Sequence, residues 1–487
     1  MAAPEPRRKT SVGMVIGTCQ PSSPNKSTSG VSQAVHRREA LRAATVGRVE
    51  GTTTDLGAEA LRIATELIRL DTTNTGDSTS VGERQAAQYV MGLLQEVGYQ
   101  PQYFESEPRR GTVLLRIEGS DAGRPGLVLH GHLDVVPAEA MDWQTDPFGG
   151  EIIDGYLWGR GAVDMKDMDA MMLAVVRQWA QQGLRPPRDV LLCFFADEEA
   201  GGRLGSHWTV EHHAEFFAGA TEAVGEVGGY STYVAGRRVY LLQTAEKGLT
   251  WLRLVARGTA GHGSASNPDN AVVHLVNALQ RVARQAWPGH LNSTMQQLLS
   301  GAADLAGLPI DLAEPDSWEP VLAAFGPARR WVAPSTATAC NLTGLQGGSK
   351  VNVVPGQASG LVDMRPLPGH SAPALEQIEV LAGPHVSVEQ INQDAGIEAP
   401  IDCDLVQAMQ AALNRADPEA AVLPYMMPGG TDAKALSRLG IAGYGFAPLQ
   451  LPVGFDFTAM FHGVDERVPV QAIDFGANVL ADFLAHC

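Results

Sequence analysis

The chain of 487 residues is acidic, with 54 Asp and Glu against 36 Lys and Arg, and its net charge is −18. This charge argues against a nucleic-acid-binding protein, and no apolar stretch is long enough for a transmembrane helix, so we expect neither nucleic acid nor a membrane as a partner. The five cysteines are odd in number and contain no Cys-x-x-Cys pair, which indicates neither a disulfide framework nor a thiolate zinc site. We expect a reducing, cytoplasmic location.

The charge is divided unevenly along the chain. Residues 1–48 carry a net charge of +6, whereas the remainder carries −24. The basic segment is rich in Ser, Thr and Pro and lacks apolar periodicity, so we expect a disordered head over residues 1–50. An Arg-rich and Ser-rich head is also typical of an organelle transit peptide, and this alternative stays open.

Regular elements are predicted from residue 56 onward. Apolar spacing indicates helices at 58–69, 82–97 and 167–182 and strands at 112–117, 126–129 and 189–195. Strands that alternate with helices predict an α/β domain with a mainly parallel sheet. A different order follows: a strand at 249–257, a helix at 270–285, strands at 336–345 and 358–364, a helix at 372–381 and a strand at 386–391.

This second order, βαββαβ, is that of a compact two-layer domain. A segment rich in Pro and Gly, residues 288–335, lies between its first helix and its second strand. Helices at 402–415 and 470–486 then resume the first pattern. The sequence therefore predicts a catalytic domain in two parts, 51–246 and 397–487, interrupted by a lid or dimerisation domain at 247–396.

The first motif with catalytic potential follows the strand that begins at Gly126. His130, His132 and Asp134 alternate along the chain and are expected to point the same way. A His that ligates a metal usually donates its other N–H to a carboxylate, and Asp134 supplies one. A buried structural histidine is the alternative.

Asp164 follows a glycine-rich turn and precedes a helix. A carboxylate at such a position can bridge two cations, although the commoner use of such an Asp is to cap a helix N-terminus.

Three acids end the apolar strand at 189–195. In open α/β sheets, sites form at the carboxyl ends of strands. The adjacent Glu198 and Glu199 point in different directions, so one can ligate a metal while the other acts as a general base. A solvated acidic turn is the alternative reading of these residues.

Two further residues, Glu226 in a glycine-rich loop and His462 near the C-terminus, are weak signals alone. Together the candidates form a set of two imidazoles and three carboxylates that suits a pair of zinc ions: His132, Asp164, Glu199, Glu226 and His462.

These motifs, in this order, resemble the co-catalytic di-zinc peptidase family of aminoacylase, carnosinase, glutamate carboxypeptidase, acetylornithine deacetylase and succinyl-diaminopimelate desuccinylase. The resemblance runs from about Leu56 to the C-terminus. It implies a zinc-peptidase catalytic domain with a mixed central sheet and two Zn²⁺ per chain, with Co²⁺ or Mn²⁺ as substitutes. It also implies that Asp134 orients His132 and that Glu198 is the general base.

The resemblance assigns roles to the other ligands as well. Asp164 would bridge the two metals, with His132 and Glu226 on one and Glu199 and His462 on the other. The peptide bond between Asp164 and Met165 would be cis.

In the inserted domain, the resemblance assigns His262 to the scissile carbonyl, across the dimer in dimeric members. Asn352 and Arg365 would hold a substrate carboxylate, and Gly430 and Thr431 would line the opposite side.

The expected activity is cleavage of an amide or peptide bond next to a free carboxylate, as by a dipeptidase, a carboxypeptidase or an N-acyl-amino-acid amidohydrolase, with a homodimer formed through the lid. A biosynthetic deacylase of the acetylornithine or succinyl-diaminopimelate type and a non-catalytic scaffold relative are the alternatives.

Overall fold

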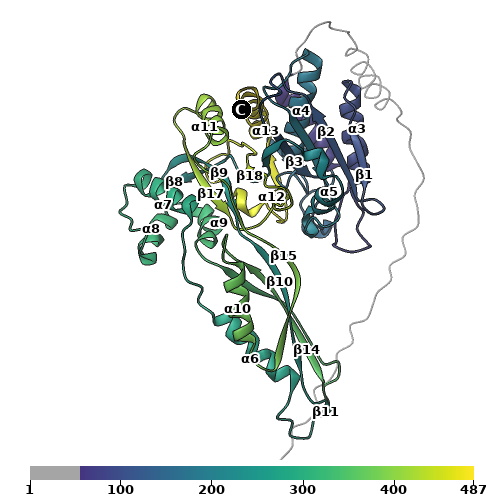
Figure 1. Ribbon diagram of the computed structural model, residues 1–487, viewed down its shortest axis with the longest axis vertical. Coiled ribbons are helices and arrows are strands. Elements are labelled where there is room, and N and C mark those ends of the chain that lie inside the picture. The colour runs from purple at the N-terminus through teal and green to yellow at the C-terminus, as the bar shows by residue number, and fades with distance from the viewer. Residues whose placement is uncertain (1–54) are drawn as a thin grey trace, which may run out of the picture. The chain divides into compact units, whose positions relative to one another are not determined.

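The computed structural model describes residues 55–487 (Figure 1). The predicted basic head over residues 1–50 lies outside the described residues. Among the helices of residues 55–487, none combines the length and the apolar character needed to span a membrane.

A ten-stranded sheet forms the centre of the larger body. Its strands are β1 (Gln102–Glu105), β2 (Gly111–Ile117), β3 (Gly126–His132), β6 (Val190–Phe195), β7 (Ala220–Gly225), β8 (Tyr230–Val234), β9 (Arg237–Glu246), β16 (Ile397–Glu398), β17 (Ala421–Met427) and β18 (Ala442–Gly445). The order is β1-β2-β6-β3-β7-β18-β9-β16, and β8 and β17 also pair with β9. β3 runs parallel to β6 and β7, and β18 parallel to β7, whereas β1, β2 and β16 join antiparallel. This confirms the predicted mixed central sheet.

The helices of this body are α2 (Leu56–Ile68), α3 (Arg84–Glu96), α4 (Lys166–Gln182), α5 (Ser206–His212), α11 (Asp404–Ala416), α12 (Ala433–Ser437) and α13 (Val470–His486). Asp55 caps the N-terminus of α2, because its carboxylate accepts a hydrogen bond from the main-chain N–H of Gly57. It buries Ala60, Ile63 and Leu67 and contacts α4 and α13. A small sheet of β4 (Glu151–Ile153), β5 (Tyr156–Trp158) and β19 (Arg467–Pro469) completes the body.

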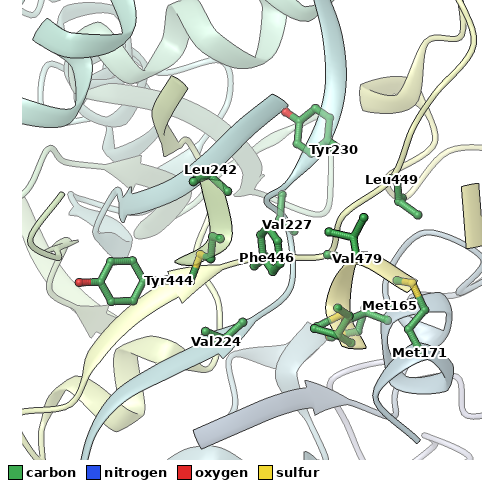
Figure 2. Packing of buried hydrophobic residues seen from close by; sticks show 14 of the residues in the cluster. Met165, Met171, Val224, Val227, Tyr230, Leu242, Tyr444, Phe446, Leu449 and Val479 are labelled. Carbon is green, nitrogen blue, oxygen red and sulfur yellow. The ribbon is translucent and has the colours of Figure 1, made fainter. Parts of the chain in front are cut away.

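Figure 2 shows part of the main hydrophobic core. Val224 from β7, Phe446 from the segment after β18, Met171 from α4 and Val479 from α13 are all buried there. Burial of one large apolar side chain contributes roughly 1.5–3 kcal/mol. The core therefore fixes the ends of the central strands, from which the site residues project.

The smaller domain consists of a four-stranded antiparallel sheet and two helices. Its elements are β10 (Leu249–Arg257), α6 (Ala271–Arg284), β12 (Ala339–Gly347), β14 (Gln357–Arg365), α10 (Ser371–Ala382) and β15 (Val386–Asp394), with the sheet order β12-β14-β10-β15. Leu252, Leu275, Val362 and Ile378 belong to a separate core. The predicted βαββαβ order is confirmed. A two-stranded sheet of β11 (Gly261–His262) and β13 (Val353–Val354) lies at the end of β10 and β14 (Figure 1).

The segment predicted as an insertion at 288–335 is helical in the structure. It contains α7 (Ser293–Ala306), α8 (Trp318–Ala323) and α9 (Arg329–Val332). Met295, Leu298 and Trp318 belong to the main core, and α7 contacts β17. The chain therefore returns to the larger body within the stretch that the sequence assigned to the lid.

Candidate metal centre and active site

β3 carries His132 to the carboxyl end of the central parallel strands. The imidazole is buried, and its Nδ1 lies 3.0 Å from the main-chain oxygen of Asp134 and 3.5 Å from its Oδ1. Nε2, on the other side of the ring, lies 3.1 Å from Asp164 Oδ1 and 3.4 Å from Glu226 Oε2. The ring is thus held at one nitrogen, and the other faces two carboxylates.

Asp134 also fixes the loop after β6. Its Oδ1 accepts a hydrogen bond from the main-chain N–H of Glu198 and its Oδ2 one from that of Glu199, each at 3.1 Å. Asn74 donates a further bond to Oδ2 at 2.8 Å. One buried carboxylate therefore orients both His132 and the pair of glutamates.

Asp164 lies between the two predicted halves of the centre. Oδ1 faces His132, as above, and Oδ2 lies 3.3 Å from Nε2 of His462. The same His462 nitrogen lies 3.0 Å from Glu199 Oε2. The peptide bond between Asp164 and Met165 is cis, as the resemblance implied.

Burial, together with repulsion between neighbouring carboxylates, raises the pKa values of acids in the centre. Burial and the charge of Glu226 raise the pKa of Glu198 well above its usual range. Burial also raises the pKa of Glu226 to about 8. Hydrogen bonds to Asp164 and Glu199 raise the pKa of His462 to about 10. Without added cations the cluster carries more negative charge than a buried site tolerates.

The donor set fits divalent metal ions. Within residues 55–487, His132, Asp164 and Glu199 place ligand atoms within 4.8 Å of one another, as do His132, Glu198 and Glu226. His462 belongs to neither group, although it contacts Asp164 and Glu199. In addition, Oε1 of Glu199 is buried and accepts no hydrogen bond, and a metal ion would satisfy it.

Four of the five metal-ligand candidates line a cleft of about 410 Å³ between the larger body and the lid sheet. It is lined by Asp164, Glu198, Glu199, Glu226 and His462, by the polar residues His207, Asp363, Arg365, Asp394 and Lys434, by the apolar residues Val227, Leu249, Trp251, Trp331, Met427, Pro428 and Phe461, and by Gly201, Gly429 and Gly430. Arg365 pairs through Nε and Nη2 with both oxygens of Asp363, at 2.6 and 3.0 Å.

Five predicted site residues do not line this cleft: His132 and Asp134, which are buried, and His262, Asn352 and Thr431. His262 and Asn352 lie in and beside the small β11–β13 sheet, where His262 is exposed and contacts Ser264. Thr431 is buried, and its main-chain N–H and its hydroxyl both donate to Glu246. His130, predicted to point with His132, is buried against Phe195, and burial lowers its pKa to about 4.

Two buried acids at the site have no counterpart in the sequence prediction. Glu246, at the end of β9, pairs with Lys434 at 2.6 Å and holds the loop that contains Thr431. Glu466 pairs with Arg160 at 2.7 Å and accepts main-chain hydrogen bonds from the turn before Asp164. The one feature of the sequence that could have indicated a role for Glu466 is its position four residues after the ligand candidate His462.

The chain is similar to known proteins over most of its length. Residues 128–486 match the peptidase family M20/M25/M40. Aminoacylase-1 of Sus scrofa is 27% identical over 408 residues, which cover 82% of this chain and 89% of that protein. The N-fatty-acyl-amino acid synthase/hydrolase PM20D1 of Xenopus tropicalis is 27% identical over 399 residues, covering 77% of this chain and 76% of the relative.

Among solved structures, the metallo-carboxypeptidase Sso-CP2 of Sulfolobus solfataricus superposes with a TM-score of 0.69 at 17% identity. The match covers 88% of this chain and 99% of that one. The family match spans most of the chain and includes every candidate metal ligand. The chain therefore belongs to the M20/M25/M40 peptidase family, whose members are metal-dependent hydrolases of amide and peptide bonds.

Proposed function

We propose that this protein hydrolyses an amide bond next to a free carboxylate, with two zinc ions in the cleft and Glu198 as the general base. His132, Asp164 and Glu226 would hold one ion, and Asp164, Glu199 and His462 the other. The observation that carries the proposal is the placement of Asp164, whose two oxygens face one imidazole each.

When bound, the ions would supply Lewis-acid activation of water and of the scissile carbonyl. Glu198 would take a proton from the attacking water and return it to the nitrogen of the departing amine. Its place in the lining of the cleft, beside the ligand candidates Glu199 and Glu226, supports this role. Asp134 would keep Glu198 in place through the main-chain N–H bond.

Arg365 is the proposed partner of the substrate carboxylate. Nε and Nη2 are occupied by Asp363, whereas Nη1 makes no hydrogen bond with the described part of the chain. Asp363 thus fixes the plane of the guanidinium and leaves one edge for the substrate.

The other walls of the cleft favour an apolar acyl group or side chain. Trp331 and Phe461 stack with their ring centroids 5.2 Å apart. On β10, Leu249 and Trp251 face the cleft beside the Asp363–Arg365 pair of β14. This lining supports N-acyl amino acids, dipeptides or C-terminal residues with apolar groups over the strongly polar substrates of the biosynthetic deacylases.

We also propose a homodimer through the lid domain. β12 is an edge strand, and the apolar residues Leu342, Leu345, Val273 and Val276 are exposed on β12 and α6. A second copy could bring its own His262 and Asn352 to the cleft. Light scattering would test this, with Leu345→Glu expected to yield monomers and an unchanged dimer arguing against this interface.

Activity on a substrate panel tests the proposed chemistry. Zinc-loaded wild type and Glu198→Gln are assayed with dipeptides and with N-acetyl, N-succinyl and longer N-acyl amino acids. We expect turnover of apolar substrates, and a loss of about 10²–10⁴-fold in Glu198→Gln. Both proteins should retain the same metal content. Undiminished turnover in the variant would reject Glu198 as the base, and turnover of no substrate would reject the hydrolase.

A further inference from the structure

The lid domain contains a second group of metal-ligand residues that the proposed chemistry does not use. Asp269 lies just before α6, His274 lies on α6, and His385 lies in the loop between α10 and β15. Their ligand atoms lie within 4.8 Å of one another. None of the three lines the catalytic cleft.

The three side chains make direct contact. Nε2 of His274 lies 3.1 Å from Oδ1 of Asp269. The rings of His274 and His385 stack, with centroids 4.2 Å apart and planes inclined by 10°. His385 is 116 residues from Asp269 and 111 residues from His274 in the sequence. The three potential ligands thus bring together two segments that are distant in the chain.

Asp269 is held in place by neighbours of its own. Thr259 donates from its hydroxyl to Oδ2 at 2.7 Å, and its main-chain N–H donates to the carbonyl of Asp269 at 2.8 Å. Such support of a carboxylate by a neighbouring donor is typical of metal ligands.

A cavity of about 330 Å³ lies beside the two imidazoles and leaves room for water or a further ligand. Arg281 also lines it, but its guanidinium donates to the carbonyls of Leu381 and Ala382 at 2.7 and 2.9 Å. These bonds keep the arginine charge at the end of α10 and away from a pairing with Asp269.

We propose that Asp269, His274 and His385 form a separate site for one divalent transition-metal ion of the zinc class. Two imidazoles and one carboxylate are a common donor set for such ions, and water would complete the coordination. In the stacked arrangement the two imidazoles cannot both direct a nitrogen lone pair at one ion, so binding requires the ring of His385 to rotate. His385 is exposed and follows Gly383 and Pro384, which leaves its side chain free to do so. The ion would tie the start of α6 to the loop before β15.

Metal content per chain tests this site without reference to activity. Full-length protein is stripped with a chelator, reloaded with Zn²⁺, desalted and analysed for metal. His385→Ala and Asp269→Asn should each bind one ion fewer than the wild type. Both should keep wild-type turnover, because their side chains do not line the cleft.

His370→Ala is the matched control, since His370 and His290 also pack their rings together, at 4.6 Å, but without a carboxylate. It should bind as many ions as the wild type. The same loss of one ion is expected when His385→Ala is added to His132→Ala/His462→Ala, so that the outcome does not depend on the cleft. Equal metal content in wild type and His385→Ala would overturn the proposal, as would an equal loss in His370→Ala.

Discussion

Glu466 holds the main chain of Asp164, a residue 302 positions away in the sequence: its Oε1 accepts the N–H of Asp164 at 3.3 Å. The same carboxylate accepts the N–H groups of Gly161 and Val163 and pairs with Arg160. The turn that presents the bridging carboxylate is therefore fixed by a buried acid from the C-terminal part of the chain.

Glu466→Gln should lower both stability and metal binding. The change leaves Arg160 buried without its charged partner, which costs about 3 kcal/mol. Urea unfolding and zinc content would measure the two effects. Glu319→Gln removes the acid of an exposed pair with Arg329 and should change stability by less than about 1 kcal/mol. Equal effects in both variants would contradict the assigned role.

Asp134→Asn should reduce activity or zinc affinity by about 10–100-fold with little change in fold. In the wild type, Asn74 and the main-chain N–H groups of Glu198 and Glu199 all donate to the carboxylate of Asp134. The NH₂ group of an asparagine side chain is a donor, so at least one of these three donors would lose its acceptor. Steady-state assays at several zinc concentrations would detect the loss. Asp189→Asn is the control, because Asp189 also accepts a main-chain N–H but precedes β6, at the opposite end of the strand.

Arg365→Lys should raise KM about tenfold, the equivalent of one hydrogen bond of ~1.4 kcal/mol, and should change kcat little. An ammonium cannot pair with Asp363 and a substrate carboxylate in the fixed fork of a guanidinium. The comparison uses each substrate and its carboxamide analogue. A similar KM increase for the carboxamide would show that Arg365 does not recognise the carboxylate.

Lys247 lies between β9 and β10, where the chain first passes from the larger body into the lid. Its Nζ donates to the carbonyls of Pro334 and Ala337 at 2.9 and 2.6 Å, in the segment where the chain enters the lid again before β12. Burial, with the nearby charge of Arg365, lowers its pKa to about 7. Between pH 7 and 10.5 the unfolded state therefore binds more protons than the folded state, and stability rises with pH.

The stability of wild type relative to Lys247→Met should consequently increase with pH over this window, by at most about 1.4 kcal/mol per pH unit. Urea unfolding at several pH values measures the difference. Lys350→Met removes an exposed lysine and controls for the loss of charge alone. A difference between wild type and Lys247→Met that stays constant across the window would contradict the lowered pKa.

Much of the fold was predictable because its signals are local. The helix predicted at 470–486 matches α13, and the strand at 249–257 matches β10, since apolar periodicity is visible within one element. β9 was not predicted, although it pairs with β8, β16, β17 and β18. The helices of 288–335 pack on the main core, which no pattern within that segment indicates.

The sequence by itself determined the family resemblance and the five metal-ligand candidates, because the short motifs that contain them occur together and in order, although Glu226 and His462 are weak signals alone. Only the tertiary structure placed Glu246 beside Lys434 and Glu466 against the main chain of Asp164. It also brought Asp269, His274 and His385 together. Such contacts depend on strand order and on packing between segments that are distant in the sequence. The role of a buried charged side chain can be assigned only when the group that it pairs with is known.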